Sequence, residues 1–202
     1  MRHAVRMRKT KYALPIFLLT LILTSLACTM NVGGPDYSNL PVVPVSTEYA
    51  QSIQDEVQRA FQEGAQSGTI KLNLTEQQIT SYIAAKLQSD PRLQRNGQPL
   101  ITDPQVYLRD GQMKIYGKTQ QGMFTANIGI VVDVSVDENG QPKVEIASAD
   151  FGPLPAPEGL RDSVAAMIRE AYMGSLGPVA TGLRIENISI ADGVMTVSGR
   201  IK

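Results

Sequence analysis

The stretch 124–136 constrains the fold most, because apolar residues occupy every second position along its whole length. Successive side chains of a β-strand point to opposite faces, so this alternation predicts one long strand with a dry face and a wetter face. Such a strand is typical of an antiparallel sheet that is covered on one side. The apolar positions are Phe124, Ala126, Ile128, Ile130, Val132, Val134 and Val136.

Turn sequences predict three antiparallel hairpins, and with a further strand at 69–74 they give about seven strands. Asp110-Gly111 and Asp192-Gly193 each suit a two-residue type I′ turn. For Glu138-Asn139-Gly140 we expect a three-residue loop with the glycine in the left-handed region, because a two-residue turn would mix the apolar and polar faces. The expected pairs are Val106 with Ile115, Leu108 with Met113, Val132 with Ile146, Val134 with Val144, Ile188 with Val197 and Ile190 with Met195.

The first and last of these hairpins are similar in sequence. Residues 106–118 match residues 188–200 at a constant offset of 82, and each copy has Met two positions after the turn glycine and Gly six positions after it. Either Asp-Gly hairpins simply look alike, or the chain contains a duplicated helix-plus-hairpin unit. A duplication would place a groove between the two units, which is a natural ligand site.

Three amphipathic helices are expected. Ser46 or Thr47 can cap the first, and Gly68 follows its end. The second begins with the capping-box sequence Thr75-Glu76-Gln77-Gln78, and the third has Pro157 in its first turn. We expect the apolar stripe of the first helix to pack on the domain's own sheet, with a partner-binding surface as the alternative. The helices span about 47–66, 76–88 and 158–173, and that stripe is Tyr49, Ile53, Val57 and Phe61.

The N-terminus has the parts of an export signal. Five basic residues and no acidic one precede the uncharged, Leu-rich stretch 12–27, which is shorter than a membrane-spanning helix. We therefore expect 1–27 to be a signal peptide. The sequence Thr24-Ser25-Leu26-Ala27-Cys28 resembles a bacterial lipoprotein signal, in which the Cys becomes the acylated first residue of the mature protein. The resemblance implies a lipid anchor, such as palmitate, on Cys28; a retained anchor and plain secretion are the alternatives.

The rest of the chain divides into a spacer and one domain. Glycines and prolines in 28–46 disfavour regular structure, so this segment is expected to be a flexible linker that holds the domain off the membrane. Residues 47–202 are expected to form a single α+β extracytoplasmic domain, in which 92–103 is a polar loop. Removing 1–27 leaves 175 residues, enough for one domain with its own hydrophobic core.

Composition argues against several classes of function. The chain without 1–27 keeps 14 basic and 19 acidic side chains, a formal charge of −5, which is unfavourable for binding nucleic acid. His3, the only histidine, lies in the signal, so His-based catalysis and ordinary zinc sites are excluded. We expect no enzyme activity and no cofactor. A hydrolase built on two carboxylates is the remaining catalytic alternative.

Methionines and tyrosines are the candidate binding residues. Met113, Met167 and Met195 can fill the core or line an apolar groove between helix and sheet, because Met adapts its shape. We assign them to a candidate ligand site. Tyr107 and Tyr116 are expected on the outer face of the first hairpin. Surface packing is favoured there over stacking on a sugar.

The order of elements resembles a group of small bacterial envelope proteins related to the tubular lipid-binding fold, in which a sheet wraps a long helix. The resemblance covers roughly 69–201. It rests on the helix start Leu74-Thr75-Glu76 with Ile79 and Ile83, on Phe151-Gly152-Pro153-Leu154-Pro155, and on the closing hairpin 183–199. It implies a lipid ligand without identifying its contact residues.

The sequence therefore predicts an α+β fold with three helices and a mainly antiparallel sheet of about seven strands. The expected function is that of a non-enzymatic envelope lipoprotein, anchored at the cell membrane or outer membrane, that binds a lipid or other apolar ligand between helix and sheet. The alternative is a protein-interaction or structural module at the cell surface without a small ligand. No particular protein partner follows from the sequence.

Overall fold

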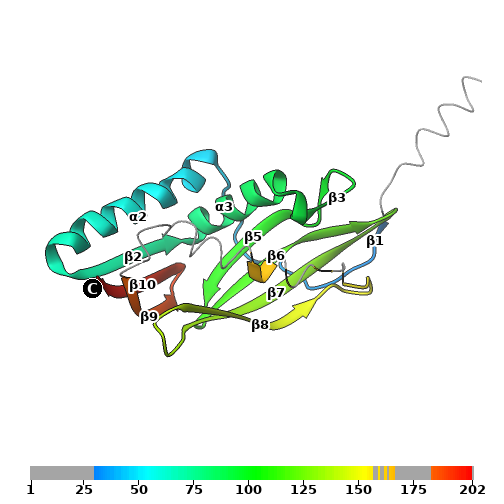
Figure 1. The fold of residues 1–202 in the computed structure, drawn as a ribbon. Helices are drawn as coiled ribbons and strands as arrows, with labels where there is room; N and C mark the ends of the chain where they lie inside the picture. The colour runs from blue at the N-terminus through cyan, green and yellow to red at the C-terminus, as the bar shows by residue number, and fades with distance from the viewer. Residues whose placement is uncertain (1–29, 157–158, 160–161, 163, 167–182, 202) are drawn as a thin grey trace, which may run out of the picture.

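The strands form two main sheets (Figure 1) in the computed structural model, which describes residues 30–156, 159, 162, 164–166 and 183–201. The larger sheet contains the antiparallel neighbours β5 (Thr102–Arg109), β6 (Gln112–Gln121), β7 (Phe124–Val136) and β8 (Pro142–Asp150). The smaller sheet has the order β2-β10-β9, with β2 (Thr69–Thr75), β9 (Leu183–Ala191) and β10 (Val194–Ile201). All seven predicted strands are present, but in two sheets rather than one, because turn chemistry determines each hairpin and not which hairpins pair.

The predicted hairpin registers are confirmed at every expected pair, from Val106 opposite Ile115 to Ile190 opposite Met195. Asp110 and Asp192 both have positive φ, as a type I′ turn requires, and Gly140 is left-handed in its three-residue loop. The two similar hairpins also share an irregularity. In each, the preceding strand bulges opposite Gly117 or Gly199, where an added Cβ would lie under 3.0 Å from a backbone oxygen. The sequence likeness of the two hairpins thus extends to their backbone geometry.

Two predicted helices are confirmed with their caps. α2 (Thr47–Ser67) begins at Ser46, whose hydroxyl accepts from the N–H of Tyr49, and ends at left-handed Gly68. α3 (Glu76–Ser89) begins with the complete capping box between Thr75 and Gln78. No helix in the described ranges is long and apolar enough to cross a membrane.

The third predicted helix falls mostly outside the described residues. Asp162 and 164–166 are helical, and Val164 is fully buried in the core. Met167 and the rest of 158–173 lie outside the described part of the chain. The prediction of a polar loop at 92–103 is wrong, because this stretch contains a small hairpin and the buried side chains of Leu93 and Ile101. That stretch and the preceding turn hold η1 (Pro91–Leu93), β3 (Gln94–Arg95) and β4 (Gln98–Pro99).

One hydrophobic core joins both sheets and both described helices. Ile79, Ile83 and Leu87 of α3 pack there with the dry faces of β5, β6 and β7. α2 contributes Ile53 and Val57, so its stripe packs on the domain as expected, although Tyr49 remains exposed. Each large side chain removed from water contributes about 1.5–3 kcal/mol to stability. Part of the opposite face of the larger sheet, around Tyr107 and Tyr116, is covered by the N-terminal segment.

Candidate functional site

The segment 30–45, called here the N-terminal strap, lies along the larger sheet. β1 (Met30–Asn31) pairs in parallel with the start of β7, and the N–H of Met30 donates to the Met123 carbonyl at 2.8 Å. Farther on, the N–H of Asn127 donates to the Gly33 carbonyl at 2.8 Å. The described part of the expected linker is therefore not a free spacer; it belongs to the domain from Met30 onward.

Close contact at Gly34 fixes the path of the strap. A Cβ added there would lie 2.1 Å from the backbone oxygen of Asn127, and φ is +110°, a value that favours glycine. Gly152 approaches from the other side, since its own added Cβ would lie 2.8 Å from the Cα of Gly34. The strap thus passes between β7 and the turn that follows β8, where a larger residue has no room.

A tyrosine cluster holds the middle of the strap. The ring of Tyr37 stacks on that of Tyr116 at 5.2 Å between centroids, and Tyr107 meets Tyr116 edge-on at 5.8 Å. The hydroxyl of Tyr107 donates to the carbonyl of Pro41 at 3.0 Å. Burial under the strap raises the pKa of Tyr107, whose exposed fraction is 3%. The prediction of a surface-exposed Tyr107 is wrong, because the strap covers this face and uses the rings for internal packing.

The end of the strap leads directly into α2. The N–H of Val43 donates to Oε1 of Gln105 at 2.7 Å, and the valine side chain is buried. The N–H of Ser46 then donates to Oγ of Ser81 in α3 at 3.1 Å. These contacts join residues 62 and 35 positions apart, so the strap ties β5 and α3 to the start of α2.

A shallow hollow of about 330 Å³ runs beside the strap, lined by Tyr37, Leu40, Val42, Lys118 and others. Nζ of Lys118 lies 2.9 Å from Oδ2 of Asp103, and this hydrogen-bonded pair raises the pKa of Lys118. Val42 is 82% exposed at its rim. The hollow therefore combines an apolar edge with one ion pair. Among the described residues, no group of three or more His, Cys, Asp or Glu side chains could hold a metal ion.

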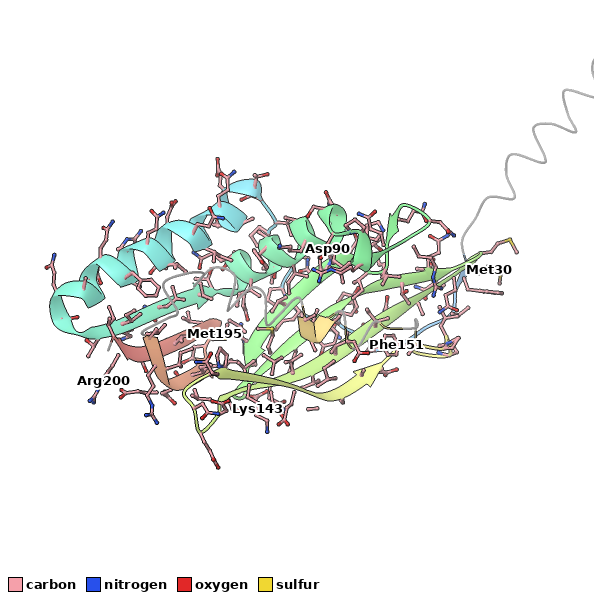
Figure 2. All side chains as sticks on the ribbon, viewed as in Figure 1. Met30, Asp90, Lys143, Phe151, Met195 and Arg200 are labelled. Atoms are coloured by element: carbon pink, nitrogen blue, oxygen red, sulfur yellow. The ribbon has the colours of Figure 1, made fainter. Side chains whose placement is uncertain are left out.

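The end of the larger sheet next to β1 carries a different surface. This sheet tip consists of Met30 and the turn 121–124 between β6 and β7, and Figure 2 labels Met30 at its end. Met30, Met123 and Phe124 are 60%, 64% and 43% exposed. A second hollow, of about 510 Å³, separates the turn from the β3–β4 hairpin and has Arg95 in its lining. The tip is thus an apolar edge beside one basic side chain.

The predicted methionine site is brought together only in part. Met113 and Met195 are each 1% exposed and belong to the same hydrophobic core, in equivalent positions of the two similar hairpins. Figure 2 labels Met195. The N–H of Gly193 donates to the carbonyl of Leu108 at 3.1 Å, which joins the two hairpins. Neither methionine lines the two hollows above. Met167 and Cys28 lie outside the described residues.

Sequence reasoning missed the strap and the sheet tip. The strap has no helical or strand periodicity, and its contacts join residues far apart, such as Asn127 with Pro35, 92 positions away. At the tip one signal was present, because Met30 and Met123 are large apolar residues placed where polar turn residues would be expected. The alternation also predicts Phe124 on the dry face of its strand, and this is wrong, since its side chain is 43% exposed at the strand end.

Comparison with known proteins gives no assignment. Protein-family models find no match to this sequence, and neither does a search of curated proteins. Among solved structures, a crystal structure of lipopolysaccharide binding protein aligns with 67% of this chain and 50% of its own, at 11% identity and a TM-score of 0.30. The alignment thus spans half of that protein, and neither a shared fold nor a shared function follows from so low a score.

Proposed function

We propose that this chain is a non-enzymatic envelope lipoprotein, anchored outside the cytoplasm by lipid on Cys28, whose domain binds a lipid or another apolar ligand. The basic and apolar stretches of 1–27, followed by the only cysteine, support the anchor. A chain without histidine after its signal supports binding over catalysis. The observation that carries the ligand proposal is the pair Met113 and Met195, which occupy equivalent places in one core between the helices and both sheets.

Metabolic labelling tests the anchor. We expect the full chain, expressed in a bacterial host fed an alkyne analogue of palmitate, to incorporate label and to sediment with the membranes. Cys28→Ala should lose the label, because it removes the only thiol that can be acylated. Equal labelling of the two proteins would refute the anchor on Cys28.

Extraction of the purified chain tests the ligand. Met has three rotatable bonds, so a core built around Met113 and Met195 can repack around an apolar guest. We expect organic extraction and mass spectrometry of the full chain, after exchange into a detergent absent from the host, to recover one lipid in stoichiometric amount. Met113→Ala with Met195→Ala should reduce its recovery. If the purified chain contains no lipid and does not bind added lipid, the proposal of an apolar ligand is wrong.

A protein-interaction module at the cell surface is the second candidate, favoured by one observation. Leu40, Val42, Val45 and Tyr49 are exposed and follow one another from the strap into the first turn of α2. Apolar residues gathered in this way often mark an interaction site. A photo-reactive amino acid at Val42 should crosslink a discrete partner in intact cells, whereas the same group at exposed Asn139 should not. Identical crosslinking patterns at the two positions would remove this candidate.

A further inference from the structure

The connection between Cys28 and the sheet is very short. Only Thr29 separates Cys28 from Met30, and Met30 is already hydrogen-bonded to Met123. Two residues span at most about 7 Å, even when fully extended. If lipid holds Cys28 at the membrane, which is the proposed function on which this inference rests, the sheet tip therefore lies at the bilayer surface.

The composition of the tip matches that location. Its exposed side chains are Met30, Met123 and Phe124, and the segments 29–35, 94–102 and 119–127 that surround it contain no Asp or Glu. The chain from Cys28 onward is nevertheless acidic, at a formal charge of −5. Arg95, on the β3–β4 hairpin, is exposed and lines the same hollow as Gly122 of the turn. An apolar edge free of carboxylates and flanked by a guanidinium suits the zone of phosphate headgroups and upper acyl chains.

We propose that the sheet tip is a second membrane contact, in which Met30, Met123 and Phe124 enter the headgroup region of the bilayer and orient the domain. A lipid anchor alone would leave the domain free to rotate about Thr29. Insertion of the tip fixes the direction of β7 instead, so that its far end points away from the bilayer. β7 rises over its length by about 40 Å, which places the exposed Asn139 turn well out in water.

Site-directed fluorescence on the full chain tests this contact. Met123→Cys is labelled with an environment-sensitive maleimide, in chains reconstituted into vesicles of phosphatidylethanolamine and phosphatidylglycerol. Acylated Cys28 has no free thiol, so the introduced cysteine is the only site that reacts. We expect a blue-shifted emission that lipids carrying a nitroxide near the headgroup quench. Asn139→Cys is the matched control, and its emission should stay unshifted and unquenched. Adding Phe124→Ser to Met123→Cys should reduce the quenching.

The possible outcomes separate the two proposals. If the unsubstituted chain reacts with the maleimide, Cys28 is not acylated, and both the anchor and the tip contact are overturned. If it does not react, but the label at 123 behaves as the label at 139 does, the anchor stands and the tip contact is overturned. A blue shift that grows with the protein-to-lipid ratio, without nitroxide quenching, would mean contact between copies of the chain, and it also overturns the tip contact.

Discussion

At the scale of single residues, Glu76 joins three elements, through its side chain and its backbone N–H. Its Oε1 accepts from the buried N–H of Leu108 at 2.8 Å and also pairs with Arg109, while its own N–H donates to the carbonyl of Gly193. The first residue of α3 is therefore the point where both similar hairpins meet. The capping box predicts that a helix starts here, but not that the carboxylate reaches a strand 32 positions away.

Glu76→Ala should destabilise the domain by about 1–3 kcal/mol, because it leaves the buried N–H of Leu108 without an acceptor. Glu76→Gln keeps an acceptor and should cost less. Arg109→Ala removes only a side chain that is 44% exposed and should cost about 0–1 kcal/mol. Urea unfolding followed by circular dichroism measures all three. Equal losses for Glu76→Ala and Arg109→Ala would show that the ion pair, rather than the backbone contact, carries the effect.

Asp90 provides a pH-dependent test at the same scale. The side chain of Arg92 donates to its carboxylate, with help from the Arg92 backbone N–H, and lowers the pKa of Asp90 from 3.8 to about 2. A lowered pKa means that the contribution to stability is present above pH 3.8 and is lost as the pH falls through about 2. Arg92→Gln should raise the Asp90 pKa in a carboxyl-detected NMR titration. An unchanged midpoint would contradict the assigned cause.

At the scale of elements, the hairpins were predictable and the strap was not. Asp-Gly turns and strict alternation are local signals, and they predict the register of Leu108 opposite Met113 correctly. The segment 30–45 has no such local signal. It is held by single contacts with residues far away in the chain, such as the hydrogen bond between Val43 and Gln105, and these leave no pattern in the sequence. Glycines and prolines that make a segment irregular do not make it mobile. The burial of Tyr107 was missed for the same reason. The alternation places its side chain correctly on the outer face of β5, but it does not predict that the strap covers the ring.

Gly34→Ala should detach the strap from β7, since the new Cβ would lie 2.1 Å from the carbonyl oxygen of Asn127. We expect faster hydrogen exchange at the amides of Val32 and Asn127, because the hydrogen bonds that these two amides donate join the strap to β7. Gly33→Ala is the matched control, because its φ is also positive, at +100°, while nothing lies within 4 Å of the added Cβ. If hydrogen exchange at these amides is equally fast in the two variants, backbone strain rather than steric exclusion determines whether the strap stays attached to β7.

At the scale of the whole molecule, the candidate site is only partly predictable from sequence. The proposed anchor at Cys28 rests on adjacent residues alone. The alternation of the hairpin strands likewise predicts the burial of Met113 and Met195 on dry faces, which the structure confirms. Sequence does not predict that Met113 and Met195 share one core, or that Met30 forms a hydrogen bond with Met123. Both depend on how segments far apart in the chain pack together. From Met30 onward, the segment that was expected to be a spacer is thus packed on the larger sheet.

Mass spectrometry of the N-terminal peptide from the membrane-bound protein shows whether Cys28 carries the anchor. We predict a chain that begins at Cys28 and carries fatty acyl groups on that residue, two positions before the strand that starts at Met30. A mature chain that retains 1–27, or that begins elsewhere with an unmodified Cys28, would contradict it.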